Sequence, residues 1–467
     1  MKKLFFIVLL FGGVLCNAQN PFTGIWQGTM SSEGIEFFTV FSIEETEDGD
    51  LTGLMHMPQQ MIINFESLTF ETREDSIWIK IPAFRAQYSA LVNKDTMYGL
   101  WYQMGEEITL NLGLTPETEA FQIRRPQTPT EPFPYYSKDV KFYNKKAKIW
   151  LAGTLTLPDT LQDWPVVVLV TGSGPQDRNE SLLEHKPFLV IADYFTRNGI
   201  GVLRYDDRGV ADSEGDFSSA TTYDFASDAE AAIDFLTKKK FVSKDQIGLA
   251  GHSEGGMIAI MEGSNKKLAF SISMAGVGIP CDELLVLQND LILKGYGKSE
   301  EMRKDMAEMN AALYELVQEE KDATELRKKI EVLIEETKAG LTEEQIIEYG
   351  LTDMYAYTIM SQVNTTWFRA FIAFDPGEYL KKIKVNFLAI NGSSDVQVPA
   401  EVNINAMKSL IQPKKGQIVD FKIFDNLNHL FQYSESGMTT EYAMIEETID
   451  PEVLEYMVGW IKKVLEN

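Results

Sequence analysis

The stretch Gln246-Ile-Gly-Leu-Ala-Gly-His-Ser-Glu-Gly-Gly256 decides the fold that we expect for this chain. Its first five residues are typical of a strand, and Gly251 to Gly255 follow as G-x-S-x-G, which predicts a sharp strand-to-helix turn with the Ser253 hydroxyl exposed above a sheet. Side chains at Gly251 and Gly255 would collide with neighbouring backbone in so sharp a bend, and glycine avoids the collision because it lacks a Cβ. A glycine-rich turn with a helix-capping serine is the alternative that the pentapeptide alone leaves open.

The chain on both sides of this turn alternates apolar runs with helical stretches. Val166-Val-Val-Leu-Val170 is a continuous apolar run, as expected of a parallel strand that is buried on both faces. Further strand-like runs are Gly201 to Tyr205, Ala269 to Met274, Val385 to Ile390 and Val419 to Phe424. Helical stretches such as Asp224 to Leu236 lie between most of them. The pattern predicts a doubly wound α/β sheet.

The alternation is interrupted between about Asp282 and Trp367. Apolar residues recur there at spacings of four and three, at Met302, Met306, Met309, Leu313 and Leu316. The runs are too short for an independent coiled coil, so we expect a helical cap insertion over the carboxyl edge of the sheet. An ordinary helical excursion away from that edge is the alternative. The methionines suggest that the cap lines an adaptable apolar pocket.

The amino-terminal part of the chain has a different texture. From Phe22 to about Arg125, short alternating runs are separated by turn residues, and we expect residues 20–125 to form a small all-β module, as a sandwich or a barrel. Its aromatic residues are predicted to be core. A proline-rich linker follows at residues 126–137, and residues 138–467 are expected to form the α/β domain.

Residues 1–18 have the composition of a signal peptide, with Lys2-Lys3 before an apolar stretch and a small-x-small cleavage site at Cys16-Asn-Ala18. We expect export to the periplasm or beyond, with lipidation at Cys16 as the less favoured alternative. After cleavage the chain retains Cys281 alone and has no later run long enough to be an integral membrane segment. The net charge of −26 argues against nucleic acid and anionic membrane surfaces as partners.

A serine in such a turn needs a general base, and the chain has four histidines. His56 lies in the all-β module, and His252 is adjacent to the serine with its side chain expected to point away from it. His185 precedes the serine in the chain but remains within reach of the site. His429 follows the last predicted strand, on a loop at the carboxyl end of the sheet, and is therefore the predicted base.

An acid is also needed, because a carboxylate fixes the imidazole tautomer and stabilises the imidazolium. Asp395 follows directly from the strand Val385 to Ile390, so its loop is delivered to the same edge as the serine. Asp425 is the rival but is too close to His429 in the chain to reach its Nδ1 easily. The predicted triad is Ser253, Asp395 and His429.

The negative charge that develops on an attacked carbonyl requires two hydrogen-bond donors. We expect one to be the backbone N–H of Glu254, the residue after the serine. The other is expected in Thr171-Gly-Ser-Gly-Pro-Gln-Asp-Arg178, where we select the amide of Ser173. The loop lacks the G-K-[ST] ending of a phosphate-binding loop, and no cysteine and histidine cluster has metal-ligand spacing, so neither a metal nor an organic cofactor is expected.

Four motifs together carry a family resemblance: Gly172 to Arg178, Arg204-Tyr-Asp-Asp-Arg-Gly209, Gly251 to Gly256 and Leu427-Asn-His-Leu-Phe431. The chain resembles bacterial α/β-hydrolase esterases of the dienelactone-hydrolase-like group, and the order serine, aspartate, histidine is the order of that fold. The resemblance covers nearly the whole mature chain and implies an α/β-hydrolase sheet with a helical cap, preceded by a small all-β domain.

The sequence departs from this group at two places. Thr171 stands where the group usually has a histidine, and Arg208-Gly-Val-Ala-Asp-Ser213 lacks one glycine of the R-G-x-G-x-S loop. We expect Asp206 and Arg208 to pair and hold that loop.

The activity implied is that of a serine carboxylesterase that hydrolyses short- to medium-chain acyl esters of small molecules through an acyl-enzyme. A serine peptidase or aminoacyl-peptidase, a thioesterase and an acyltransferase would use the same triad and stay open. An inert hydrolase domain in a carbohydrate- or surface-binding protein would require a broken triad. No feature of the sequence sets the oligomeric state.

Overall fold

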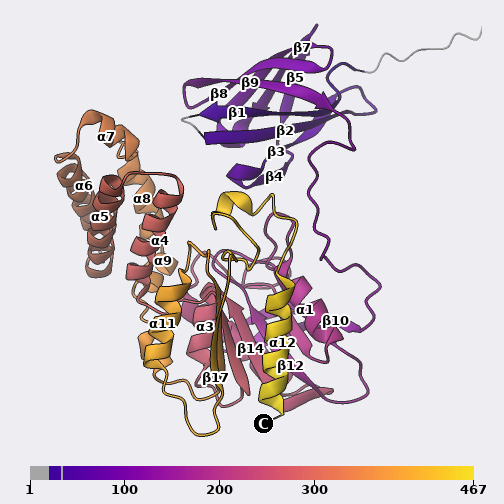
Figure 1. Ribbon diagram of the computed structural model, residues 1–467, viewed down its shortest axis with the longest axis vertical. Helices are drawn as coiled ribbons and strands as arrows, with labels where there is room; N and C mark the ends of the chain where they lie inside the picture. Colours follow the sequence, from indigo (N-terminus) through magenta and orange to yellow (C-terminus); the bar gives the residue numbers. More distant parts are fainter. Residues whose placement is uncertain (1–19, 33–34, 353, 467) are drawn as a thin grey trace, which may run out of the picture. The chain divides into compact units, whose positions relative to one another are not determined.

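The computed structural model describes residues 20–32, 35–352 and 354–466, so the predicted signal peptide lies outside the described residues. The chain divides into two compact units, residues 1–122 and residues 123–467 (Figure 1). Among the helices of the described ranges, none is both long and apolar enough to cross a membrane.

The first unit is one antiparallel sheet of nine strands in the order β4-β3-β2-β1-β9-β8-β7-β6-β5. Its elements are β1 (Gly24–Ser32), β2 (Ile35–Glu45), β3 (Leu51–Met57), η1 (Pro58–Gln60), β4 (Ile62–Phe65), β5 (Thr69–Arg73), β6 (Ser76–Ile81), η2 (Pro82–Phe84), β7 (Ala86–Asn93), β8 (Thr96–Gln103) and β9 (Glu106–Thr115). Hairpins join most successive strands, as the short alternating runs predict.

This sheet curls around its own core. The rings of Phe41 on β2 and Tyr88 on β7 stack with their centroids 5.6 Å apart. Along a flat sheet these strands would be four positions, or about 19 Å, apart. Trp26 and Trp101 are buried in the same core, so the aromatic residues here stabilise the module.

The second unit is a mixed sheet of eight strands in the order β10-β11-β13-β12-β14-β15-β16-β17. The strands are β10 (Tyr136–Asn144), β11 (Ile149–Leu157), β12 (Trp164–Val170), β13 (Gly201–Tyr205), β14 (Val242–His252), β15 (Phe270–Met274), β16 (Asn386–Gly392) and β17 (Val419–Phe424). β11 runs antiparallel to both neighbours, and β12 to β17 are parallel. The order reverses between β12 and β14, a switch point at whose carboxyl ends α/β proteins place their sites.

Helices cover both faces of this sheet. They are α1 (Pro187–Arg197), α2 (Thr222–Leu236), α3 (Glu254–Glu262), α11 (Ala400–Leu410) and α12 (Pro451–Leu465), whereas the short η3 (Thr439–Glu441) belongs to the segment between β17 and α12. α1 and α12 lie side by side and pack on Val167 and Leu169 of β12, whereas α2 and α3 pack on Val166 and Val168 (Figure 1). Each strand residue therefore meets a helix, and the prediction of an α/β-hydrolase sheet is confirmed.

Between β15 and β16 the chain inserts helices α4 (Cys281–Gly295), α5 (Glu300–Glu319), α6 (Ala323–Lys338), α7 (Glu343–Glu348), α8 (Tyr355–Val363), α9 (Thr366–Ile372) and α10 (Gly377–Leu380). Figure 1 shows α5 to α8 grouped together beside the sheet, with α4 and α9 toward it. Their core includes Leu284 and Leu313 and joins Val277 and Val398, which follow the carboxyl ends of β15 and β16. The insertion thus packs on loops at the carboxyl edge of the sheet.

The methionines of α5 do not line a pocket, and the expectation that they do is wrong. Met302, Met306 and Met309 are buried and pack against Tyr349 and Leu351 within the insertion itself. Their spacing places them on the inner face of the helix, where methionine fills gaps between helices.

Candidate active site

Ser253 lies in a strained turn between β14 and α3. Its backbone has φ 53° and ψ −114°, a conformation that residues with a side chain rarely adopt. A Cβ on Gly251 would lie 1.9 Å from the carbonyl oxygen of Gly255, and a Cβ on Gly255 would lie 2.1 Å from that of Val170. Only glycine fits at both positions, so the predicted sharp bend is present and leaves Ser253 half-buried at its apex.

The loop that follows β12, residues Thr171 to Arg178, lies against this turn. We call it the oxyanion loop. A Cβ on Gly172 would be 3.2 Å from the Cβ of Ser253, a tight contact, so glycine at this position lets the loop approach the serine closely. The two loops meet where the strand order reverses, which places Ser253 at the switch point of the sheet.

Three carboxylates hold the oxyanion loop by its backbone amides. Glu180 accepts from Gly172 at 2.7 Å, Asp207 from Gln176 at 3.0 Å and Asp206 from Arg178 at 2.8 Å. Asp207 also accepts a hydrogen bond of 2.7 Å from the hydroxyl of Thr171. Thr171 therefore supports the loop through its hydroxyl, although the resembled group usually has a histidine there.

The amides of Ser173 and Glu254 are the predicted oxyanion donors. Within the described part of the chain, the backbone N–H groups of Ser173 and Glu254 donate to no protein acceptor. Glu254 is the first residue of α3, whose dipole adds positive potential at this point. These are the two amides that the sequence predicts as oxyanion donors.

The structure brings the predicted base and acid together. His429 Nδ1 lies 2.7 Å from Asp395 Oδ2, and both side chains are almost completely buried. The other carboxylate oxygen of Asp395 accepts from the amides of Gln397 and Val398, each at 2.8 Å. This fixes the carboxylate opposite His429 Nδ1, whereas the rival Asp425 is an exposed turn residue.

Ser253 and His429 do not share a hydrogen bond within 3.5 Å among the described contacts. A base and a nucleophile often come into contact only when substrate is bound.

His252 has a function that the sequence reasoning missed. Its Nε2 lies 2.9 Å from the backbone oxygen of His429, and its Nδ1 lies 3.0 Å from the Glu180 carboxylate. Burial, the largest single effect, disfavours the imidazolium, but the charge and hydrogen bond of Glu180, the backbone oxygen of His429 and the charge of Asp395 together raise the pKa of His252. His252 therefore ties the loop of the base to the carboxylate that holds the oxyanion loop.

The expected pair of Asp206 and Arg208 is wrong. Asp206 makes a two-pronged ion pair with Arg178, at 3.0 and 2.6 Å, and Arg208 makes one with Asp228, at 2.7 and 3.0 Å. Asp206 and Arg208 stand at alternate positions directly after β13, and their side chains contact different partners. Asp206 still has a structural role, because it binds Arg178 at the end of the oxyanion loop.

The Glu254 side chain is a further residue that the sequence reasoning did not single out. It is buried and accepts hydrogen bonds from Thr222 on α2 and, at 3.0 and 3.2 Å, from the indole N–H of Trp367 on α9. Burial raises its pKa, and these two donors oppose the rise. The residue after the nucleophile is thereby bonded to the inserted helices.

The remaining histidine near this unit's loops is structural. His185 is buried, with Nδ1 3.0 Å from Thr448 and Nε2 3.1 Å from the backbone oxygen of Tyr442. Burial lowers its pKa to about 4. Across the described ranges, no group of three or more histidine, cysteine or acidic residues could hold a metal ion.

Comparison with known families supports a hydrolase. A sequence profile of the family described as X-Pro dipeptidyl-peptidase (S15 family) matches residues 148–424, more than half of the chain. Esterase EstD of Thermotoga maritima is 25% identical over 313 residues, which cover 67% of this chain and 66% of that enzyme. The chain thus spans slightly less than two thirds of the length of this relative.

Solved structures with a similar chain path include the alpha/beta hydrolase GrgF from Penicillium, with 15% identity and a TM-score of 0.43 over 71% of this chain and 100% of that one. A hypothetical protein of Pseudomonas aeruginosa has 15% identity and a TM-score of 0.45, over 74% and 99% of the two chains. An esterase of Pyrococcus furiosus has 15% identity and a TM-score of 0.41, over 74% and 98%. The finer resemblance to the dienelactone-hydrolase-like group stays a prediction.

Proposed function

Because the chain belongs to the X-Pro dipeptidyl-peptidase (S15) family of hydrolases, we propose that it is a serine hydrolase, and specifically a carboxylesterase for short- to medium-chain acyl esters. The observation that carries this proposal is the 2.7 Å contact between Asp395 and His429 on the same sheet edge as the strained turn of Ser253. A fixed base near a partly exposed serine is what acyl transfer to serine needs.

In the proposed mechanism, His429 takes the proton of Ser253 and the serine oxygen attacks the acyl carbonyl. The amides of Glu254 and Ser173 stabilise the oxyanion. The C–O bond to the alcohol then breaks as His429 returns the proton to the leaving oxygen, which leaves an acyl-serine. Water, deprotonated by His429, attacks this ester and releases the acid.

The name of the family makes a peptidase the second candidate. A dipeptidyl-peptidase has to recognise the free ammonium of its substrate, and a carboxylate near the nucleophile is the group suited to it. Four buried carboxylates adjoin Ser253 and the oxyanion loop, and all are already occupied: Glu254 by Thr222 and Trp367, Glu180 by an amide and a histidine, Asp207 by a hydroxyl and an amide, and Asp206 by Arg178. Their occupation favours a neutral acyl group over an amino-terminal one.

The proposal extends to the substrate and to the compartment of the enzyme. Its partner is a small-molecule ester, as the name of the Thermotoga maritima esterase suggests. The composition of residues 1–18 supports export to the periplasm or beyond.

The test is a substrate panel on purified protein. Ser253→Ala should lower the hydrolysis of p-nitrophenyl butyrate by about 1,000-fold or more and abolish labelling by a fluorophosphonate probe. Ser137→Ala, on an exposed position of β10, is the matched control and should keep full activity. Parent-level hydrolysis by Ser253→Ala would contradict the serine mechanism.

The same panel separates the candidate activities. We expect kcat/KM for p-nitrophenyl esters to exceed that for X-Pro p-nitroanilides and for acyl thioesters. A larger kcat/KM for the anilide would assign a peptidase, and a larger one for the thioester would assign a thioesterase. Product ester formation in the presence of an added alcohol would assign an acyltransferase.

A further inference from the structure

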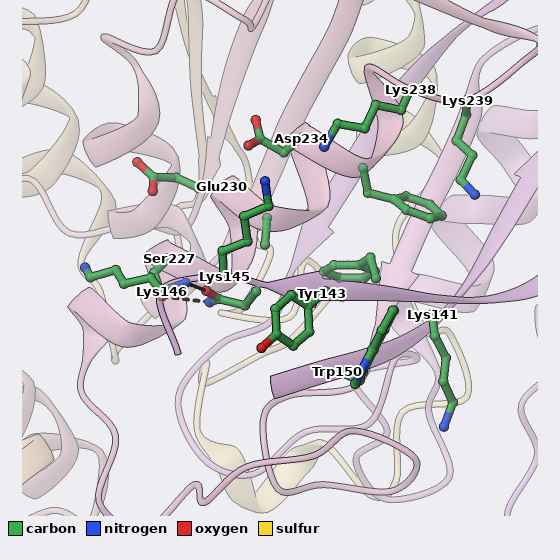
Figure 2. Close-up of a pocket in the computed structure, with 14 residues that line it drawn as sticks. Lys141, Tyr143, Lys145, Lys146, Trp150, Ser227, Glu230, Asp234, Lys238 and Lys239 are labelled. Atoms are coloured by element: carbon green, nitrogen blue, oxygen red, sulfur yellow. Dashed lines mark hydrogen bonds between the residues drawn. The ribbon is translucent and has the colours of Figure 1, made fainter. Parts of the chain in front are cut away.

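A groove of about 420 Å³ lies between the β10–β11 hairpin and α2, and it shares no residue with the triad or the oxyanion loop. Figure 2 shows the aromatic rings of Tyr143 and Trp150 on the hairpin, with the carboxylates of Glu230 and Asp234 on α2. Five lysines also line it: Lys141, Lys145, Lys146, Lys238 and Lys239. The groove therefore combines ring faces, ammonium groups and carboxylates.

Positive charge is concentrated here in an otherwise acidic protein. Residues 138–148 and 238–244 contain nine lysines and one acidic residue, whereas the whole chain has 43 basic and 69 acidic residues. A local surplus of this size, in a chain with a net charge of −26, favours the binding of anions at this face.

The protein does not neutralise the lysines of the groove with its own carboxylates. Within the described residues, none of the five forms an ion pair within 4.0 Å, although Glu230 and Asp234 line the same groove. Asp234 instead pairs with Lys267, which lies outside the groove. Lys239 is held with its ammonium 3.9 Å from the ring centroid of Phe235. The ammonium groups are therefore available to a ligand.

Two aromatic side chains form a platform beside these lysines. Tyr143 and Trp150 are direct cross-strand partners with ring centroids 5.2 Å apart, and such pairs stabilise a hairpin. Yet 42% of Tyr143 and 47% of Trp150 remain exposed, so hairpin packing uses only part of each ring. The exposed faces are suited to stack against the apolar face of a sugar ring.

The walls of the groove are fixed to one another. The Asn144 side chain donates to Ser227, at 2.9 Å, and to Asp228, at 2.6 Å, on α2. Its carbonyl oxygen accepts from the amides of Lys146 and Ala147, which shapes the turn of the hairpin. A groove with fixed walls orders few groups when a ligand binds, so less binding energy is lost.

We propose that this groove binds a chain of sugar acids, such as a uronic acid oligosaccharide. In this complex Trp150 and Tyr143 stack on sugar rings, and the lysines pair with sugar carboxylates. Glu230 and Asp234 accept hydrogen bonds from sugar hydroxyls. The proposal is independent of the chemistry at Ser253.

A phosphate chain fits the same groove less well. Arginine is the residue best matched to phosphate geometry, and the groove has none. Glu230 and Asp234 would repel phosphate oxygens, which carry no hydrogen to donate to them. A sugar acid has both charges for the lysines and hydroxyls for the carboxylates.

The test is calorimetric titration of the full chain with a hexamer of galacturonic acid, and with neutral maltohexaose as the comparison ligand. We expect the uronate to bind, with an affinity that falls as salt rises, and maltohexaose to bind at least about tenfold more weakly. The double variant Lys145→Gln, Lys146→Gln should lower the affinity for the uronate about fivefold or more. Trp150→Ala should lower it about tenfold.

The matched control is Lys414→Gln, Lys415→Gln, an exposed adjacent lysine pair on another loop, which should leave the affinity unchanged. All groove variants should keep the hydrolysis of p-nitrophenyl butyrate, which also shows that they fold. The proposal is overturned if the uronate does not bind, or if the control pair weakens binding as much as the groove pair. Tighter binding of polyphosphate or oligothymidylate than of the uronate would also overturn it.

Discussion

Replacing Gly255 with alanine should displace the oxyanion loop and slow acyl transfer about 100-fold. The new methyl group would lie 2.1 Å from the carbonyl oxygen of Val170 and 2.6 Å from that of Thr171. Val170 ends β12, and Thr171 begins the loop that carries the amide of Ser173. The collision is with backbone, so no side-chain rotation relieves it.

The size of the effect follows from these distances. Cβ atoms do not approach other atoms more closely than about 3.0 Å, so β12 and α3 have to separate by about 1 Å. A displacement of this size at a catalytic group costs about 100-fold in rate, or roughly 2.7 kcal/mol of transition-state stabilisation. The loss should fall on kcat, because the amide of Ser173 acts on the charge that develops during reaction.

The measurement is the steady-state hydrolysis of p-nitrophenyl butyrate by Gly255→Ala and by Gly459→Ala. The control glycine lies in α12, where an added Cβ meets nothing within 4 Å, so Gly459→Ala should keep its activity and lose no stability. Circular dichroism and thermal unfolding would show that both variants are folded. A folded Gly255→Ala enzyme with kcat within threefold of the parent would refute the reasoning.

Two further predictions concern buried carboxylates. Asp395→Asn should lower kcat by about 1,000-fold or more, because His429 loses the acceptor that fixes its tautomer. Asp425→Asn, at an exposed turn, should retain the activity of the parent. Equal losses in the two variants would count against Asp395 as the acid of the triad. Burial raises the pKa of Asp207 to about 7. The protonated Asp207 therefore contributes most to the free energy of unfolding at or below pH 4, where the carboxyl of the unfolded chain is also protonated. This contribution is lost as the pH rises through 7. The loss is on the order of 4 kcal/mol. The free energy of unfolding, measured with urea from pH 4 to pH 8, should therefore depend less on pH for Asp207→Asn than for the parent. Parallel curves for the two proteins would contradict this prediction.

Features that depend on strand order were predictable from the sequence. A glycine-flanked serine after a strand, and polar residues after later strands, meet at one edge because the carboxyl ends of parallel strands lie together. This reasoning selects Ser253, Asp395 and His429 without any contact information. The apolar run of β12 likewise predicts helices on both faces of the sheet, and that prediction is confirmed.

Features that depend on which loops touch were not predictable. The pairs Arg178 with Asp206 and Arg208 with Asp228 join segments 20 to 28 residues apart, and neighbouring charges in the sequence gave the wrong partners. The link between His252 and Glu180 spans 72 residues and has no periodic signal. The sequence signal that these residues share is a charged residue close to the end of a strand, which indicates that the side chain supports a loop there but not which partner it contacts.

The hydrogen bond from Trp367 to Glu254 limits how freely the inserted helices can be exchanged for others. Glu254 is buried one residue from the nucleophile; without Trp367 its Oε1 would keep the donor Thr222, but its Oε2 would have none, at a cost of about 1–3 kcal/mol. An insertion taken from another protein therefore has to supply its own hydrogen-bond donor to Glu254. Otherwise Glu254 has to be replaced by a residue that is not acidic. The inserted helices therefore supply a hydrogen bond to the residue that follows the predicted nucleophile.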